Sequence, residues 1–530
     1  MRIRRILFVL LLLAFVALSV WWCAYFPFDQ ARVYRAIPPN ATFVSRHEQL
    51  GVRWKEAVRH PLIRAMWQLA GGAAPDLDRL ASDRDMDGFM RMAGEKCSVF
   101  AYAPAFGDTS RPAWVMSSWI GTYGNLMRWG LLKGSLSGFT RVTCPDGTKV
   151  WTVPCRDTGF GSHLSLAAAE GVLVCCLSDD PRGAWTLAKR VRGGSAMVPE
   201  LSAAATAQAG PAAPDEAWIR LASVVSRRVL LSPLHVGLSR VDKTCTAGWV
   251  RGEVAGASAA ALADTLSLTN IPMTMPSAFV LLPFGTLQSL LQGPGTPVGL
   301  RQAAARLQRE TDPSAPVFAC LLGGDHSGRI LGIKAPTLVI GVKVKNPAAA
   351  ASVVGDVLDA LNFRYGWALI PHQPENSAAA TVIDSTGNGV YSSLKTTERP
   401  AVAVGGDWLV LCSNLATLEK TLREDPKGVL SGLLEGGAAA PGTRDAVAFA
   451  WIDMEPANQA LQNAIAVYSL SLLAQGSDGS AETREGLARA SQFLDAMRPL
   501  GTGTLRFHPR GAELEMEFRF SARDGATKMP

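Results

Sequence analysis

The chain has 530 residues, of which 48% are hydrophobic, and it contains 50 glycines and 32 prolines. This composition is typical of a globular protein, and the length exceeds what one hydrophobic core supports, so we expect more than one domain. The formal net charge is +7, and no run of Lys and Arg is interleaved with aromatic residues, which argues against a nucleic-acid partner.

The chain begins with a basic and then an apolar segment. Residues 1–5 include Arg2, Arg4 and Arg5, and residues 6–26 carry no charge. As a helix, 21 residues span roughly 30 Å, which is the thickness of the hydrocarbon core of a bilayer. The positive-inside rule places residues 1–5 in the cytoplasm and the bulk of the chain on the periplasmic side of a bacterial inner membrane.

A cleaved signal peptide and a lipid-modified Cys23 are the alternatives to an uncleaved anchor. Both need small residues near the processing site, whereas Trp21 and Trp22 stand there. We therefore expect residues 6–26 to form a transmembrane signal anchor.

The exported part reads as two similar repeats, residues 27–256 and 271–530, joined by a linker helix at 257–270. A strand and a helix at 38–44 and 50–58 are matched by a strand at 275–280 and a helix at 287–291. Three further pairs of strands match, and the last pair places Cys176 on Cys412: 97–102 with 316–321, 112–116 with 336–340, and 168–176 with 402–412. An offset of more than 200 residues indicates a duplicated domain rather than a short repeat.

Turn residues and helical periodicity complete the expected architecture. Asp146-Gly147 and Asn388-Gly389 indicate hairpins, and strand pairs at 235–254 and 503–520 close the two repeats. The second repeat carries a helical insert at 456–497. The predicted fold class is α+β: an N-terminal transmembrane helix, then two similar domains with antiparallel or mixed sheets and helices packed on one face.

The anchor, the proline-led strands at 38–44 and 275–280, and the strand–helix units at 171–191 and 407–423 resemble a family of bacterial envelope proteins. That family is known only as a domain of unknown function. The resemblance implies a location and an architecture, and it brings no catalytic residue with it.

The nine cysteines include no C-x-x-C pair, and most lie in apolar runs such as 171–177, where buried thiols are expected. An exported location would also permit disulfides, and Cys144 and Cys155 flank the first hairpin. A two-residue turn at Asp146-Gly147 would place Cys144 opposite Lys149, so a bridge between the two cysteines would need another register.

Asp83, Asp85 and Asp87 alternate before a glycine, as in the first half of a calcium loop. The twelfth position, however, is Gly94 instead of the bidentate glutamate, and the matching residues 302–309 predict a helix. The alternative is a solvated helix start with Asp87 as its N-cap. The sequence leaves calcium binding at these three carboxylates open.

Other motif-like segments lack part of the pattern that their chemistry requires. His47-Glu48 has Gly51 where a zinc peptidase needs histidine, residues 325–327 lie in a predicted turn, and residues 392–395 match S-x-x-K without a K-T-G strand. The seven histidines share no metal-ligand spacing, and core packing is the default for Trp114, Trp119 and Trp129. No catalytic, cofactor-binding or metal-binding residue is assigned.

We expect a non-catalytic, membrane-anchored envelope protein that acts as a scaffold or as a binding or accessory subunit. Its expected partners are the membrane and an envelope protein, with no nucleic acid and no cofactor. The first alternative is a periplasmic carrier or sensor of a lipid or other apolar ligand. The second is an envelope hydrolase, which clustering of His163, Asp157 and a serine would favour.

Overall fold

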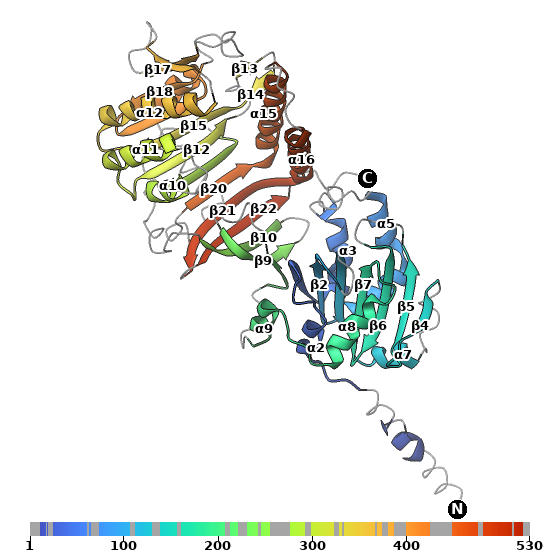
Figure 1. Ribbon diagram of the computed structural model, residues 1–530. Coiled ribbons are helices and arrows are strands. Elements are labelled where there is room, and N and C mark those ends of the chain that lie inside the picture. Colours follow the sequence, from blue (N-terminus) through green and yellow to red (C-terminus); the bar gives the residue numbers. More distant parts are fainter. Residues whose placement is uncertain are drawn as a thin grey trace, which may run out of the picture. The chain divides into compact units, whose positions relative to one another are not determined.

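The structure is a computed structural model (Figure 1). The described residues are 11–16, 18–19, 25–60, 63–64, 74–106, 112–129, 138–155, 161–206, 213–220, 230–241, 245–254, 276–291, 298–322, 328–330, 333–365, 368–373, 380–385, 399–423, 448–474, 481–510 and 513–522. The chain divides into two compact units. Unit 1 comprises Met1–Arg59, Pro75–Leu221 and His235–Ser239, and unit 2 comprises His60–Ala74, Ala222–Leu234 and Arg240–Pro530.

Unit 1 contains an antiparallel sheet of eight strands. Apolar residues dominate the central strands, which are buried on both faces, whereas the edge strand β4 is largely exposed. The spatial order of the strands is β8 (Asp215–Ile219), β1 (Phe43–Glu48), β2 (Cys97–Ala103), β3 (Ala113–Trp119), β7 (Val172–Ser178), β6 (His163–Ala169), β5 (Lys149–Pro154) and β4 (Thr140–Thr143).

Unit 2 contains a longer antiparallel sheet. The spatial order is β10 (Cys245–Val254), β22 (Glu513–Ala522), β21 (Leu500–Arg510), β20 (Ala448–Asp453), β11 (Ala278–Pro283), β12 (Pro316–Leu322), β15 (Thr337–Lys343), β19 (Trp408–Cys412), β18 (Ala401–Gly405), β17 (Ala380–Ser385) and β16 (Leu369–His372). A small hairpin of β13 (Gly328–Ile330) and β14 (Ile333–Ala335) lies apart from this sheet. All strand pairs among the described residues are antiparallel, so the mixed alternative is not seen there.

The eight strands from β20 to β16 repeat the order of the eight strands of unit 1. The register agrees as well, because Val115 lies opposite Cys176 in unit 1 and Val339 lies opposite Cys412 in unit 2. The sequence alignment had matched the same residues, because it placed 112–116 on 336–340 and Cys176 on Cys412. Each residue of one sheet therefore has a defined equivalent in the other, although an origin by duplication stays a prediction.

The strand pair expected to close the first repeat is arranged differently. β9 (Leu230–Val241) carries residues of both units, and β10 pairs along nine residues with β22 of unit 2. Two strands that the sequence did not indicate, β8 and β20, instead complete the eight-stranded arrangements. The predicted boundary between the repeats, residues 257–270, lies outside the described residues.

Helices cover both faces of each sheet, so the expectation of helices on one face is wrong. In unit 1, α2 (Gln30–Arg35) and α8 (Gly183–Arg192) contribute to the core on one face, and α6 (Arg84–Ala93) and α7 (Tyr123–Trp129) contribute to the core on the other. The physical reason is that a strand such as β7 is apolar at successive positions, and both of its faces must be removed from water. The remaining described helices of unit 1 are α3 (Leu50–Arg59) and α9 (Pro199–Thr206), while α5 (Ala74–Ser82) belongs to unit 1 from Pro75 onward.

Unit 2 follows the same plan. The helix α13 (Leu415–Arg423) packs on one core. The helices α10 (Phe284–Leu291), α11 (Val298–Leu307) and α12 (Pro347–Tyr365) pack on the core at the opposite face, and Figure 1 shows these three helices next to one another. A short 3-10 turn at Gln308–Glu310 extends α11. Two helices, α15 (Met454–Ala474) and α16 (Ala481–Met497), occupy the range of the predicted insert. Two hydrogen bonds connect them: Gln462 Nε2 donates to the Ser491 carbonyl, and Ser491 Oγ donates to Gln462 Oε1.

The predicted anchor is only partly described. Residues 6–10, 17 and 20–24 lie outside the described residues, while 11–16 and 18–19 are helical and carry exposed side chains of Leu, Phe and Val. Over the part of the chain that the structure describes, no helix is long and apolar enough to cross a membrane.

The residues that directly follow this segment pack against the sheet and helices of unit 1. The Phe28 ring packs edge-on against Trp119 with 5.5 Å between ring centroids. Asp29 caps α2 by accepting a hydrogen bond from the Ala31 amide, and Arg32 forms an ion pair with Glu170 at 3.7 Å. Residues 28–35 are therefore part of the folded unit.

Candidate functional site

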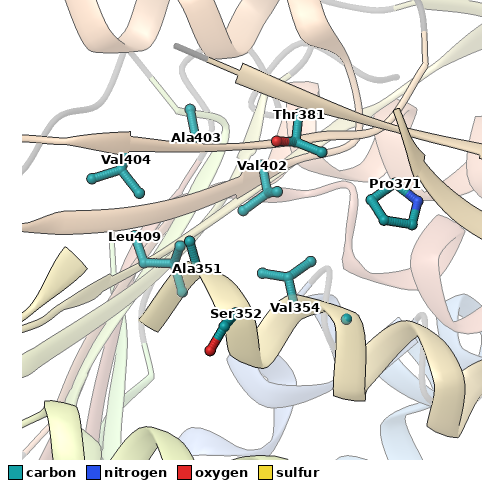
Figure 2. Close-up of a pocket in the computed structure, with 10 residues that line it drawn as sticks. Ala351, Ser352, Val354, Pro371, Thr381, Val402, Ala403, Val404 and Leu409 are labelled. Carbon is teal, nitrogen blue, oxygen red and sulfur yellow. The ribbon is translucent and has the colours of Figure 1, made fainter. Parts of the chain in front are cut away.

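An apolar cavity lies between α12 and the sheet of unit 2 (Figure 2). Its volume is about 350 Å³, within the range of about 300–1,000 Å³ that is usual for ligand pockets. The side chains that line it come from α12 and from β16, β17, β18 and β19: Ala351, Ser352, Val354, Gly355, Pro371, Thr381, Val402, Ala403, Val404 and Leu409. None of these ten residues is charged.

Two hydroxyls are the only polar side-chain groups among the lining residues. Ser352 Oγ donates to the Ala349 carbonyl of its own helix at 2.7 Å, so its hydrogen bond is already made locally. The side chains that line the cavity are therefore mostly apolar, with the Thr381 hydroxyl among them.

The corresponding space in unit 1 is filled by a tryptophan. Trp151 lies opposite Leu166 in the register of unit 1, and Thr381 lies opposite Val402 at the same place in unit 2. Trp151 is 6% exposed and belongs to a core cluster with Leu166 and Met127 of α7. Unit 2 thus has a threonine where unit 1 has an indole, and the covering helix α12 is longer than α7.

The face of the unit 2 sheet next to this cavity is open. Leu338, Leu411 and Val280 are 44%, 37% and 37% exposed, and Ile340 between them is half-buried. Ile340 lies opposite Leu411, and Leu411 lies opposite Val402 of the cavity wall. We call Val280, Leu338, Ile340 and Leu411 the open face; it is an apolar surface continuous with the cavity.

A second, polar cavity of about 300 Å³ lies in unit 1 at the turn between β4 and β5. Arg192 forms an ion pair with Asp146 at 3.0 Å and donates to Thr148 Oγ1 at 2.7 Å, so the charges in its wall neutralise one another. Burial raises the pKa of Asp146, but the hydrogen bonds from Thr148 outweigh burial and hold this pKa well below its usual value.

The turn itself differs from the expectation of two residues. Thr143 lies opposite Lys149, and the Cys144 amide donates to the Thr148 carbonyl, so Cys144 faces Thr148 rather than Lys149. The loop has three residues and ends at Gly147 with φ of +77°, which a glycine adopts without strain.

A buried ion pair lies in the core of unit 1. Arg46 Nη2 and Glu216 Oε2 are 2.8 Å apart, both side chains are 4% exposed, and Arg46 also donates to the hydroxyl of Tyr34 at 3.4 Å. Burial raises the pKa of Tyr34 far above its usual value, which keeps the phenol neutral. The equivalent residues of unit 2 are Leu281 and Phe449, which lie opposite each other as Arg46 and Glu216 do.

The three aspartates with calcium-loop spacing lie at the start of a helix and not in a calcium loop, with Asp83 just before α6 and Asp85 and Asp87 in its first turn. Asp83 is the N-cap of α6 and accepts hydrogen bonds from the amides of Asp85 and Met86, so the predicted cap at Asp87 is wrong. Asp87 instead pairs with Lys55 at 3.0 Å and with Arg91 at 3.2 Å. Among the described residues, no three His, Cys, Asp or Glu side chains gather in a way that would hold a metal ion.

The histidine candidates have structural partners. His47 Nδ1 is 2.8 Å from Asp215, which also pairs with Arg53 at 2.6 Å. His163 Nδ1 is 3.0 Å from Ser162 Oγ, and that serine also lies 3.2 Å from Asp179. A catalytic triad needs the histidine between serine and carboxylate, and here the serine is in the middle. Asp157 and residues 325–327 and 392–395 lie outside the described residues.

The cysteines and tryptophans mostly belong to the cores. The eight described cysteines are free thiols, and burial raises the pKa of Cys176 to about 12 and that of Cys412 to about 11. Trp119 is 5% exposed, and Trp114 packs against Phe43 and Tyr102. The side chain of Trp129 lies outside the described residues.

Comparisons with known proteins add a distant structural neighbour. No family model matches the chain, and no curated protein matches it. A solved structure described as "Structure of crystal form III of TP0453" aligns over 44% of this chain and 82% of its own, with 8% identity and a TM-score of 0.27. A similarity this low carries no argument about fold or function.

Proposed function

We propose that this chain is a non-catalytic, membrane-anchored protein of the bacterial envelope that binds a partner protein through the open face of unit 2. The observation that carries the proposal is the exposure of Leu338, Leu411 and Val280 on the same face of one sheet, where Ile340 and Ala319 lie between Leu411 and Val280. Contiguous apolar surface on a soluble domain usually marks an interaction site.

The proposed location rests on the N-terminal segment. Arg2, Arg4 and Arg5 before the uncharged run of residues 6–26 favour an anchor with the bulk of the chain on the periplasmic side. A protein held at a membrane encounters a restricted set of partners, so a modest apolar interface can suffice for specific assembly.

The test is crosslinking in intact cells with the full-length chain as bait. We expect a defined set of envelope proteins to be captured, and we expect the capture to be lost in the double variant L338K/L411K, because two ammonium groups would be desolvated in the interface. The matched control is F363K, since Phe363 is 95% exposed on α12 and lies outside the open face.

An anchor-deleted, exported version tests the location. Capture by the full-length chain but not by this version supports the anchor as part of the function. Equal capture by L338K/L411K and the wild type would contradict the proposed interface.

A further inference from the structure

Ser45, His47 and Asp215 form a chain of hydrogen bonds on one face of the unit 1 sheet. Ser45 and His47 are two residues apart on β1, so both side chains point to the same face, and Asp215 of β8 lies opposite His47. His47 Nε2 is 3.0 Å from Ser45 Oγ, and His47 Nδ1 is 2.8 Å from Asp215 Oδ1. The imidazole therefore lies between a hydroxyl and a carboxylate, which is the order that a serine–histidine–aspartate triad requires.

A third element holds the carboxylate in place. Arg53 of α3 donates to both oxygens of Asp215, at 2.6 and 3.0 Å, and also to the Glu48 carbonyl. Burial alone would raise the pKa of Asp215, but the hydrogen bonds from His47 and Arg53 lower it to about 2, so the carboxylate is ionised at neutral pH. An ionised Asp215 accepts the proton on Nδ1 of the imidazole and leaves Nε2 as the acceptor for the Ser45 hydroxyl.

This chain of polar groups is confined to unit 1. The equivalent positions of unit 2 all carry apolar side chains, which are Val280, Leu282 and Ala448. The shared strand order is thus compatible with apolar residues at all three places, and the fold does not require the hydrogen bonds. A nucleophile, a base and an orienting carboxylate that the fold does not require favour a chemical role.

Aromatic rings lie beside the hydroxyl on the same face. Phe43 precedes Ser45 by two residues on β1, and Phe100 of β2 lies opposite Ser45. The Phe100 ring packs edge-on against the His47 ring with 5.5 Å between centroids, and Phe43 packs against Trp114 at 5.9 Å. All three aromatic side chains are half-buried. A planar aromatic group of a substrate at Ser45 would therefore contact aromatic rings.

Two features of β1 limit the substrate further. Ser45 is 5% exposed, so only a small acyl group can approach its hydroxyl. The strand pairs with β2 on one side and with β8 on the other, so its amides bond within the sheet and do not form an oxyanion hole. Loss of one oxyanion donor costs about 10²–10³ in rate, so the site suits esters with a good leaving group better than amides.

We infer that Ser45 is a nucleophile that His47 activates for the hydrolysis of aryl esters of short-chain acids. Asp215 and Arg53 are positioning residues, because they act through the imidazole. Ser45 Oγ attacks the ester carbonyl carbon while its proton passes to His47 Nε2, and this proton then goes to the departing aryloxide. Water that His47 deprotonates then cleaves the acyl-serine, which releases the carboxylic acid and restores the hydroxyl.

The inference goes beyond the proposed function, because it gives unit 1 an activity of its own. It replaces the non-catalytic part of that proposal and leaves partner binding by unit 2 as it stands. The two are separable by experiment: S45A should capture the same envelope proteins as the wild type, and L338K/L411K should keep the reactivity of Ser45.

The experiment treats membranes that contain the full-length chain with a fluorophosphonate probe, which phosphonylates an activated serine hydroxyl and releases fluoride. Labelled peptides are identified by mass spectrometry, so the site is read directly from the wild type and does not depend on the folding of a variant. We expect label on Ser45 in the wild type and loss of the label in S45A. H47N should slow labelling by about 10²-fold or more, because it removes the general base.

The matched control is S162A, which should keep the label on Ser45. Ser162 Oγ also lies 3.0 Å from a histidine nitrogen, that of His163, but there the serine stands between histidine and carboxylate. Label on Ser162 in place of Ser45 would overturn the inference. So would a wild type that resists the probe under conditions that label a known serine esterase, or equal labelling rates in the wild type and H47N.

Two further measurements test the hydrolysis and the positioning role. With p-nitrophenyl acetate, the purified full-length chain should release a burst of nitrophenolate that S45A lacks, and equal release by both proteins would overturn the activity. D215N should slow labelling of Ser45, and D215E, which keeps a carboxylate, should restore part of the rate. A D215N protein that is less stable but is labelled at the wild-type rate would show that Asp215 has only a structural role.

Discussion

Arg46 and Glu216 occupy positions at which the second unit places a leucine and a phenylalanine. Both side chains of the pair are 4% exposed, and they lie beside a cluster of buried apolar residues. A buried ion pair gains little net stability over an apolar pair of similar volume, because desolvation of both charges offsets their attraction. Its presence in unit 1 therefore favours a role in defining that core rather than in strengthening it.

Replacement of one partner is expected to be far more harmful than replacement of both. R46L or E216F alone leaves an uncompensated buried charge and should lower the free energy of unfolding by about 3–5 kcal/mol. The double variant R46L/E216F reproduces the pair Leu281–Phe449 and should be close to the wild type. Urea unfolding of all four proteins measures the coupling, and additive effects of the two substitutions would contradict this account.

Asp215 makes the stability of unit 1 dependent on pH. Burial raises its pKa, but the hydrogen bonds from His47 and Arg53 outweigh burial and lower the pKa to about 2 from the ordinary 3.8. Because the folded state holds the proton less tightly than the unfolded state, this carboxylate stabilises the fold above about pH 4, and the contribution is lost as the pH falls toward 2.

The variant D215N should therefore lose roughly 2 kcal/mol at pH 7 and little at pH 2, where the wild-type carboxyl is itself becoming protonated. Urea unfolding of wild type and D215N at several pH values between 2 and 7 gives the difference directly. A difference that stays constant across this range would assign the loss to packing instead of charge.

At the scale of elements, glycines decide how closely α3 and α6 approach. The Gly51 amide donates to the Gly94 carbonyl at 2.8 Å, and a Cβ on Gly51 would lie 2.5 Å from the Met90 carbonyl oxygen. Both groups are backbone, so they cannot swing aside as a flexible side chain would. Small residues at this crossing are a requirement of the packing.

Gly51→Ala should lower the free energy of unfolding by about 1–3 kcal/mol, as overpacking does. Gly88→Ala in α6 is the control, since a Cβ there meets nothing within 4 Å, and it should raise stability by about 0.5–1 kcal/mol through helix propensity. Thermal unfolding of the two variants gives the comparison. Equal effects of the two substitutions would show that the helices do not meet as closely as described.

The strands at 97–102 and 112–116 and their matches at 316–321 and 336–340 were predictable from the sequence, because each apolar run could be compared between the repeats. The predicted strand at 38–44 instead lies at Phe43–Glu48, and the predicted strands at 168–176 and 402–412 each contain a turn between two strands. The match of Cys176 with Cys412 nevertheless coincides with the strand register.

The two-sided helix cover was not foreseen, although the unbroken apolar run of β7 carried the signal. β8 and β20 were missed because each is short and lies in or beside a region rich in alanine and glycine.

The cavity escaped sequence analysis for a physical reason. A missing indole leaves no motif, and Thr381 becomes informative only when the register places it on Trp151. The aspartates of α6 show the opposite case, because their spacing indicated a cation loop while the capping hydrogen bonds of Asp83 belong to a helix start. Spacing along the chain shows only which side chains are near in sequence. Whether they lie in a helix or in a loop determines whether they can converge on one cation.

At the scale of the whole molecule, both units use one strand order for cores of different character. Unit 1 is closed by Trp151 and contains a buried ion pair, whereas unit 2 is hollow beneath α12 and has an open apolar face. Under the proposed function, unit 2 is the part of the chain that binds a partner protein, and unit 1 is the part next to the N-terminal segment.

The packing of residues 28–35 against unit 1 limits how far the folded unit can move away from the N-terminal segment. A domain on a flexible linker explores a volume whose radius grows with the square root of the linker length. For a chain anchored at residues 6–26, Phe28 is already packed on Trp119 and α2 begins at Gln30, so hardly any slack separates the bilayer from the folded unit. Under the proposed anchoring, such a protein would not search the periplasm on a tether, and its targets would have to come to the membrane surface.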